Sequence, residues 1–419
     1  MAMDRRKFLQ GLAAGAGAAF LAPRLSSSDL FRTPAALAQP HTPPPASAPV
    51  PVPGSDVTMF RGNPAHTFYG TGPIRDQLQI LWTFQMGNFT SPISGKVWSG
   101  TGWTGTAVAV GDWLYVGSQD SWFYALDRNT GALRWKYKAG AMFKGSCAYF
   151  AGRIFTGCVD DHIYCFHAKT GQVLWTYNTG TDCDSSPTIY KGRLYIAGES
   201  GFVHCFRPDT GALIWRTFVD GKEGPGGSNG AETTPAIADD RVYVANFTGY
   251  LFCLRADNGA LVWKARTGDD TDASPAVSGG LVFAAAEQLS PYLFAFDAKT
   301  GAERWRFGGS FTRGFWATPA VVGNRVFIGA ENGRMYCLDA LTGKQIWEYA
   351  ANDSIWSSPA IVDNRVIFGS YDSHVHMVAA DTGRFISKIQ LKGRVLSSPC
   401  IVGGKIYIGT AEGMYYCLG

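Results

Sequence analysis

Three carboxylates occupy one recurring place in the chain. Asp184, Glu232 and Asp272 each lie three residues before the proline of a Ser-Pro or Thr-Pro dipeptide. Hard cations such as Ca²⁺ prefer several oxygen ligands that converge on one point. Asn229 adds an amide oxygen close to Glu232. These four residues are candidate ligands of a metal ion, and Asp272 is the candidate base if the site is catalytic.

Other residue types that can bind a ligand occupy the same place before the proline. It holds Lys144 in an earlier unit of the chain, and Trp316 and Trp356 in two later units. Exposed tryptophans can stack on an aromatic ring or a sugar. Alternatively, the acids lie at a solvated rim and pair with Lys144, while the tryptophans fill a channel. The candidate ligand-binding residues are Lys144, Asp184, Glu232, Asp272, Trp316 and Trp356.

Two further features add weight to this region. Asp182, Asp269 and Asp270 bring more negative charge close to the candidate carboxylates, and an insert "DGKEGPGGSNG" comes immediately before Glu232. Loops that lengthen on one face of a rigid scaffold are common places for function.

A pair of histidines also has metal-binding spacing. His374 and His376 lie two residues apart and therefore share one face of a strand. However, other repeats have an aromatic ring at the position of His376, so we interpret it as a packing histidine. No Ser-His-Asp arrangement, phosphate-binding loop or zinc-finger spacing occurs.

A repeat of about 40 residues positions all of these side chains. Its marker is Thr-Gly-x-x-x-Trp, with an Asn-Gly variant before Trp263 and a degenerate copy that has Ser387 in place of Trp. A period of this length indicates a propeller or a solenoid. Together with one tryptophan ahead of the first repeat, the tryptophans expected to be structural are Trp82, Trp135, Trp175, Trp215, Trp263, Trp305 and Trp347.

Each repeat contains four short apolar runs separated by turn residues, which is typical of one propeller blade. Eight sets of three strands begin near Thr106, Ser146, Ser186, Thr234, Ser274, Thr318, Ser358 and Ser398. The last set has no fourth strand after it, whereas "LQILWTF" with Trp82 precedes the first set. We therefore predict an all-β, eight-bladed β-propeller over residues 56–419, closed by an N-terminal outer strand that joins the C-terminal blade.

The Thr-Gly-x-x-x-Trp units and the stretch "MFRGNPAHT" at Met59–Thr67 resemble those of quinoprotein (PQQ-like) β-propellers. The resemblance implies that each tryptophan docks onto the next blade. Enzymes of that family use pyrroloquinoline quinone (PQQ) with Ca²⁺ or a lanthanide, commonly held beside a disulfide of two adjacent cysteines. Other members are inert scaffolds, including a propeller lipoprotein of the outer-membrane β-barrel assembly machinery.

The nine cysteines of the chain fit a structural role. Five of them share one repeat position with Ala125, Ala295 and Met377, which indicates a small apolar site in a packed strand. The sequence leaves open a disulfide between Cys158 and Cys183. No two cysteines are adjacent and no Cys-x-x-Cys-His motif occurs, which argues against a quinone-dependent dehydrogenase and against covalent haem.

The first residues predict export. "DRRKFLQGLAAGAGAAFLAP" resembles a twin-arginine signal, so we expect residues 1–38 to be a signal peptide and residues 39–55 a Pro-rich linker. The protein is then periplasmic or secreted. The net charge of +4 comes mostly from that signal, so we expect neither a nucleic-acid partner nor a membrane span in the mature chain.

These features favour an exported propeller that binds a small ligand or an envelope protein at the mouth of its central channel, without catalysis. The alternatives are a PQQ- and metal-dependent oxidoreductase and a carbohydrate-binding propeller.

Overall fold

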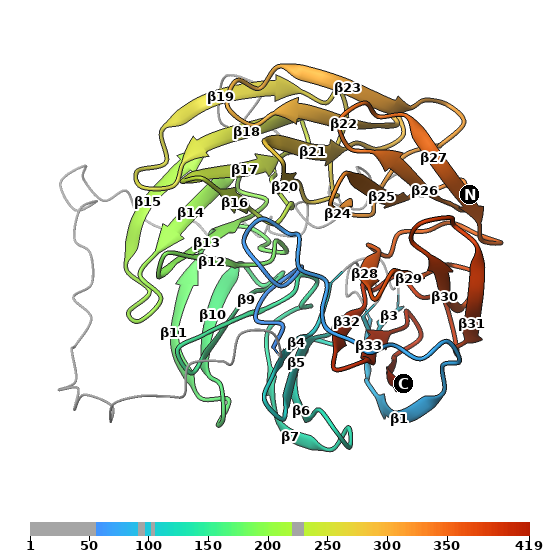
Figure 1. The fold of residues 1–419 in the computed structure, drawn as a ribbon. Helices are drawn as coiled ribbons and strands as arrows, with labels where there is room; N and C mark the ends of the chain where they lie inside the picture. The colour runs from blue at the N-terminus through green and yellow to red at the C-terminus, as the bar shows by residue number, and fades with distance from the viewer. Residues whose placement is uncertain (1–55, 91–96, 102–104, 220–229) are drawn as a thin grey trace. The chain divides into compact units, whose positions relative to one another are not determined.

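Eight four-stranded antiparallel sheets form a closed ring (Figure 1). The computed structural model describes residues 56–90, 97–101, 105–219 and 230–419. The predicted signal, linker and Asn229 lie outside these residues. The ring belongs to one of two units of the chain, that of Pro51–Phe89 and Trp98–Gly419. This arrangement confirms the predicted all-β, eight-bladed propeller.

The strands of blades 1 to 4 run from the channel outward in chain order. They are β4 (Val108–Val110), β5 (Trp113–Gly117), β6 (Trp122–Asp127), β7 (Leu133–Lys138); β8 (Ala148–Phe150), β9 (Arg153–Gly157), β10 (His162–His167), β11 (Val173–Asn178); β12 (Thr188–Tyr190), β13 (Arg193–Ala197), β14 (Phe202–Phe206), β15 (Leu213–Phe218); and β16 (Ala236–Ala238), β17 (Arg241–Ala245), β18 (Tyr250–Arg255), β19 (Leu261–Arg266).

Blades 5 to 8 repeat this order, except that the outer strand of blade 8 comes from the start of the ring. The strands are β20 (Ala276–Ser278), β21 (Leu281–Ala285), β22 (Tyr292–Asp297), β23 (Glu303–Gly308); β24 (Ala320–Val322), β25 (Arg325–Gly329), β26 (Arg334–Asp339), β27 (Gln345–Ala350); β28 (Ala360–Val362), β29 (Arg365–Gly369), β30 (His374–Ala379), β31 (Phe385–Gln390); and β32 (Cys400–Val402), β33 (Lys405–Gly409), β34 (Met414–Leu418), β1 (Ile80–Gln85). Two short strands, β2 (Asn88–Thr90) and β3 (Val97–Ser99), lie between β1 and blade 1 in the sequence.

The burial of each strand follows from its place in the blade. The second and third strands are buried on both faces because each blade packs between two others, and they read as continuous apolar runs such as "RVFIG" and "RMYCLD". The outer strands alternate, as in "LRWKYK", because only one of their faces meets a neighbouring blade. Among the described residues, no helix has the length and apolar character to cross a membrane.

The ring is closed by β1, which pairs antiparallel with β34 of the last blade. Trp82 lies opposite Cys417 in this pair, in the register that the other blades use between their third and fourth strands. Both ends of the ring are therefore held in one sheet, which removes a free edge strand. The predicted N-terminal closing strand is confirmed.

Each outer-strand tryptophan contacts the next blade around the ring. Trp135, for example, donates its indole N–H to the carbonyl of Ala168 at 2.8 Å, and a Cβ added to Gly171 would lie 2.7 Å from the indole ring. Glycine is required there because the ring covers its Cα and because its φ is +71°. The same contacts recur for Trp82, Trp175, Trp215, Trp263, Trp305 and Trp347.

All nine cysteines are buried and free, so Cys158 and Cys183 form no disulfide. Cys165, Cys205, Cys253, Cys337 and Cys417 each lie directly opposite a docking tryptophan in the neighbouring strand. A small side chain at this place leaves room for the indole. Burial raises the pKa of these thiols above the ordinary value; that of Cys165, for example, is raised to about 12.

Residues 57–76 run across the end of the channel opposite the mouth, where the blue segment loops over the centre of the ring in Figure 1. The segment gives backbone carbonyls to the inward edges of the first strands: Thr58 accepts from Tyr149, Pro64 from Ile237 and Ala65 from Val277. Inside it, Arg61 is 4% exposed and donates to the carbonyl of Pro359 at 2.5 Å. The segment therefore plugs the channel and satisfies edge amides that would otherwise lack partners.

Candidate functional site

In seven of the eight blades, two loops meet within the described residues at the end of the channel away from residues 57–76. One carries the residue three before the Ser/Thr-Pro proline, which we call the mouth position. The other is the turn between the second and third strands, and the second residue after the second strand is the turn position. In seven blades the N–H of the turn position donates to the carbonyl two residues before the mouth position, as between Val159 and Met142, Glu199 and Asp182, Phe247 and Gly230, Glu287 and Asp270, Glu331 and Gly314, Tyr371 and Ser354, and Ala411 and Arg394.

The predicted acids at the mouth positions of blades 3 to 5 line one cavity. Its volume is about 30 Å³, and Lys144, Asp184, Glu232 and Asp272 line it together with Phe60 of the plug. This is room for an ion or for about one water molecule. The side chain of Lys144 donates to Asp184 at 2.5 Å, and the two side chains are only 7% and 2% exposed. One charge of the acidic group is therefore neutralised inside the protein.

The metal-ligand set expected from the sequence falls into two groups. Oxygens of Asp184 and Glu232 gather with Glu199 within 4.8 Å of one another, whereas Asp272 gathers with Asp270 and Glu287. The structure thus brings Asp184 and Glu232 together but places Asp272 in a separate triad. Asn229 and the mouth position of blade 1, Thr104, lie outside the described residues.

Glu199 and Glu287 were missed by sequence reasoning because they do not precede a proline. Both lie at the turn position, 15 residues after the mouth position of the same blade. Reading that second position around the repeat, as was done for the first, finds both glutamates and also Glu331 and Tyr371.

Burial and mutual repulsion hold protons on part of this group. Burial, with the neighbouring carboxylate of Asp184, raises the pKa of Asp182 to about 7. Burial, with the neighbouring carboxyls of Asp184 and Glu232, also raises the pKa of Glu199 well above its ordinary value. A bound cation would displace such protons, so binding is expected to strengthen as the pH rises.

An aromatic group occupies the mouth positions of blades 6 and 7. Trp316 and Trp356 stack with ring centroids 5.1 Å apart and an angle of 13° between planes. Trp356 donates its indole N–H to Glu331 at 2.6 Å, and Tyr371 packs edge-on against it at 5.0 Å. Trp316 is only 7% exposed, so the half-buried Trp356 offers the accessible face of the pair. The mouth position of blade 8, Leu396, is buried and apolar.

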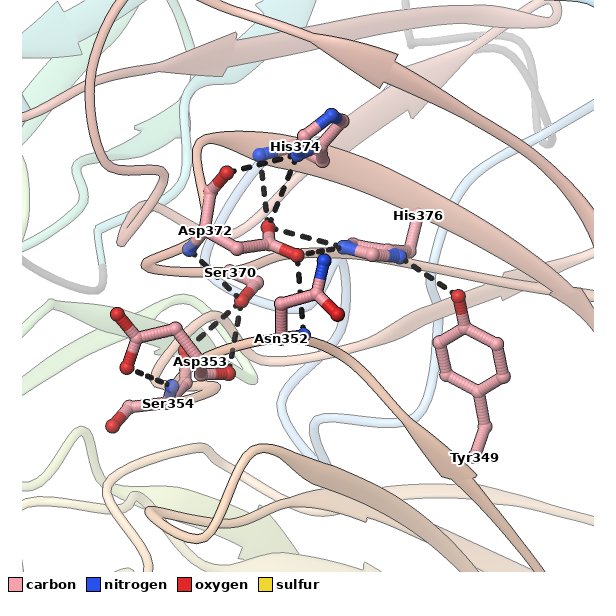
Figure 2. A network of polar contacts seen from close by, with 8 residues as sticks. All are labelled: Tyr349, Asn352, Asp353, Ser354, Ser370, Asp372, His374 and His376. Carbon is pink, nitrogen blue, oxygen red and sulfur yellow. Dashed lines mark hydrogen bonds and ion pairs between the residues drawn. The ribbon is translucent and has the colours of Figure 1, made fainter.

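A second polar group lies on the same face, in blade 7 (Figure 2). His376 is 1% exposed and stacks on Phe368. Its Nε2 lies 3.0 Å from Asp372, and its Nδ1 lies 3.0 Å from the hydroxyl of Tyr349. In blades 1 and 2 the equivalent pairs are Asp120–Tyr124 and Asp160–Tyr164, at 2.6 and 2.7 Å.

Comparisons with known proteins point to one group of propellers. A model of the protein family described as outer membrane protein assembly factor BamB matches residues 76–307 and 290–418. No curated protein matches the sequence.

Solved structures that resemble this one include dehydrogenases and a BamB protein. A europium-containing methanol dehydrogenase has a TM-score of 0.72 at 16% identity, covering 87% of this chain and 98% of that chain. The quinohemoprotein alcohol dehydrogenase of Comamonas testosteroni has a TM-score of 0.71 at 15% identity, covering 87% and 80%. BamB from Moraxella catarrhalis has a TM-score of 0.62 at 18% identity, covering 80% and 99%. At such identities the likeness concerns the fold alone.

Proposed function

Because the chain belongs to the propeller family described as outer membrane protein assembly factor BamB, we propose that it is an exported, non-catalytic propeller that binds an envelope protein at its channel mouth. The carrying observation is the concentration of carboxylates at the mouth positions of blades 3 to 5, followed at the mouth positions of the next two blades by the stacked pair Trp316–Trp356. Lys144 is the one cation among the residues described as lining the cavity. The plug closes the other end, so a partner reaches this chemistry from the mouth.

The chemistry of the mouth selects a basic partner surface. The cavity is too small for a side chain, so a lysine or arginine of the partner would approach its rim, where Asp272 and Trp356 are half-buried. Charged groups at the rim raise the rate of association more than the final affinity, so we expect binding that weakens with salt.

The experiment is site-specific photocrosslinking in the native host. A probe at Glu232 is expected to capture a defined envelope protein, whereas a probe at Gly192, in the β12–β13 turn at the opposite end of the blade, is expected to capture none. The captured protein, purified, should bind the wild type and lose affinity at least tenfold for a D184N/E232Q/D272N variant. Equal capture at both positions would contradict the proposal.

The second candidate function is a quinone-dependent oxidoreductase. The triad of Asp184, Glu199 and Glu232 favours it, because such carboxylates fit Ca²⁺. The fit of the quinone is poor. The mouth cavity measures about 30 Å³, whereas pockets for ligands of that size measure roughly 300 Å³ or more. Trp316 also stacks on Trp356 and leaves no slot between them for a flat ring.

One measurement separates the two functions. Protein purified after export from its native host is examined by absorbance for a quinone and by elemental analysis for Ca and lanthanides. A stoichiometric quinone with metal would overturn the binding proposal, and Asp184, Glu232 and Asp272 would become the residues to mutate. Protein without a quinone that still captures its partner through Glu232 would support it.

A further inference from the structure

Blade 7 brings together three side chains that bind transition metals. Asp372 lies in the turn between β29 and β30, and His374 and His376 follow on one face of β30. Their ligand atoms all lie within 4.8 Å of one another. The Nδ1 of His374 is 3.4 Å from Oδ1 of Asp372, and the Nε2 of His376 is 3.1 Å from the same oxygen (Figure 2).

These separations are close to those of a coordination sphere. Zinc binds histidine nitrogen at about 2.0–2.1 Å and carboxylate oxygen at about 2.0–2.2 Å, which makes the edge of a tetrahedron roughly 3.4 Å. Two of the three ligand edges of the cluster are therefore close to this length, but the Nδ1 of His374 lies 2.8 Å from the carbonyl of Asp372 and would give up this contact on binding a metal. Two imidazoles with one carboxylate favour Zn²⁺, Cu²⁺ or Ni²⁺ over Ca²⁺, which prefers oxygen alone.

The surroundings also suit metal ligands. A ligating histidine usually donates its other ring N–H to a fixed partner, and the Nδ1 of His376 has the hydroxyl of Tyr349 at 3.0 Å. The N–H of Asn352 holds the carboxylate of Asp372 at 3.3 Å. The side chain of His374 is 19% exposed while Asp372 and His376 are 6% and 1% exposed, so an ion can enter from the His374 side.

Blade 2 supplies an internal comparison. Asp160, His162 and Tyr164 occupy the positions of Asp372, His374 and His376. The Nδ1 of His162 lies 3.6 Å from Oδ1 of Asp160, close to the 3.4 Å between His374 and Asp372. Tyr164 bonds to Asp160 at 2.7 Å where His376 bonds to Asp372. A tyrosine hydroxyl is therefore enough to bond the turn aspartate at this position of the blade. The imidazole of His376 in blade 7 makes the same bond and adds a second histidine, which the fold does not require.

We propose that Asp372, His374 and His376 form a binding site for one divalent transition-metal ion of the Zn²⁺ class, with its remaining coordination position open toward the solvent. The site is independent of the proposed function of the channel mouth, since it shares no side chain with the acidic group.

The test uses tag-free full-length protein stripped with a chelator. Titration with Zn²⁺ by calorimetry is expected to show one site, and Cu²⁺ bound there should show two coupled nitrogens in its electron paramagnetic resonance spectrum. H376Y recreates the residues of blade 2 and should fold normally, lose about 100-fold or more in Zn²⁺ affinity, and reduce the Cu²⁺ signal to at most one nitrogen. H374A, at the more exposed ligand, should weaken Zn²⁺ equally without touching the Phe368 and Tyr349 contacts.

The matched control is H162A in blade 2, which should leave Zn²⁺ affinity unchanged. The proposal is overturned if wild-type protein binds no Zn²⁺ below millimolar concentration, if both H374A and H376Y bind it as wild type does, or if H162A removes it. In each of these cases Asp372 and His376 would be a hydrogen-bonded pair only, equivalent to Asp160 and Tyr164.

Discussion

Lys144 of blade 2 donates a 2.5 Å hydrogen bond to Asp184 of blade 3, and neither side chain is more than 7% exposed. The pair lies at the edge of the carboxylate group of blades 3 to 5. Its ammonium is a counterion that the fold itself provides for this carboxylate group.

The variant Lys144→Met should destabilise the protein by about 3 kcal/mol, because removal of one partner leaves a buried charge without its counterion. Millimolar Ca²⁺ should restore more stability to this variant than to the wild type, since a cation can then replace the ammonium. Denaturant unfolding with and without Ca²⁺ measures both effects. Lys191→Met is the control: its pair with Asp240 is 63% exposed on both sides and should contribute less than about 1 kcal/mol.

Stability should fall as the pH rises through neutrality. The pKa of Asp182 is raised from the ordinary value of 3.8 to about 7, so the folded protein holds a proton that the unfolded chain releases. The stabilising contribution is complete below about pH 4 and is lost as the pH approaches 7 and above. Asp182→Asn should therefore be more stable than the wild type by about 4 kcal/mol at pH 8 and little more stable at pH 4. Asp209→Asn, at an exposed position, is the control; a stability gain for Asp182→Asn that is equal at both pH values would contradict this account.

Trp82 should contribute to closure of the ring as well as to packing between blades. It belongs to β1, and its indole N–H reaches the carbonyl of Arg128 in blade 1 at 3.2 Å. Trp82→Ala and Trp135→Ala should each cost about 3 kcal/mol, but only Trp82→Ala weakens the contact between the two ends of the ring. We expect concentration-dependent oligomers for that variant in size-exclusion chromatography, and more so for deletion of residues 76–86. A stable monomeric deletion product would rule out closure by β1.

Arg61 should be the main anchor of the plug. Its guanidinium is buried, donates to the carbonyls of Pro359 and Pro319, and lies 4.5 Å above the ring of Tyr69. Burial lowers its pKa to about 10. Arg61→Met should cost about 3 kcal/mol because two buried carbonyls lose their donor. Arg75→Met, exposed on the same segment, should change the free energy of unfolding by less than about 0.5 kcal/mol; equal losses would show that the guanidinium is not the anchor.

The repeat explains why so much of the ring could be predicted. Strand order, closure and the mouth positions all follow from one period, so the sequence locates Asp184, Glu232 and Asp272 three residues before a proline and Lys144 three residues before the equivalent Cys147. Glu199 and Glu287 could not be placed at the mouth in this way. Their position depends on a hydrogen bond between the turn after the second strand and the mouth loop, which the repeat pattern does not reveal. The plug has no period, and Arg61 contacts a carbonyl 298 residues away, so no local pattern could indicate its place.

Met377 and Ser387 replace the cysteine–tryptophan pair of the repeat in blade 7. There the large side chain lies on the third strand and the small one on the outer strand. They lie opposite each other in β30 and β31, where other blades pair a cysteine or alanine with tryptophan, as Cys337 with Trp347. Ser387→Trp alone should overpack the strand pair and cost about 2 kcal/mol, and Met377→Ala alone should leave a cavity at about 2–3 kcal/mol. The double variant should recover at least about 1 kcal/mol of the summed loss. A double-mutant cycle by denaturant unfolding measures this coupling, and strictly additive losses would show that the two side chains do not share one space.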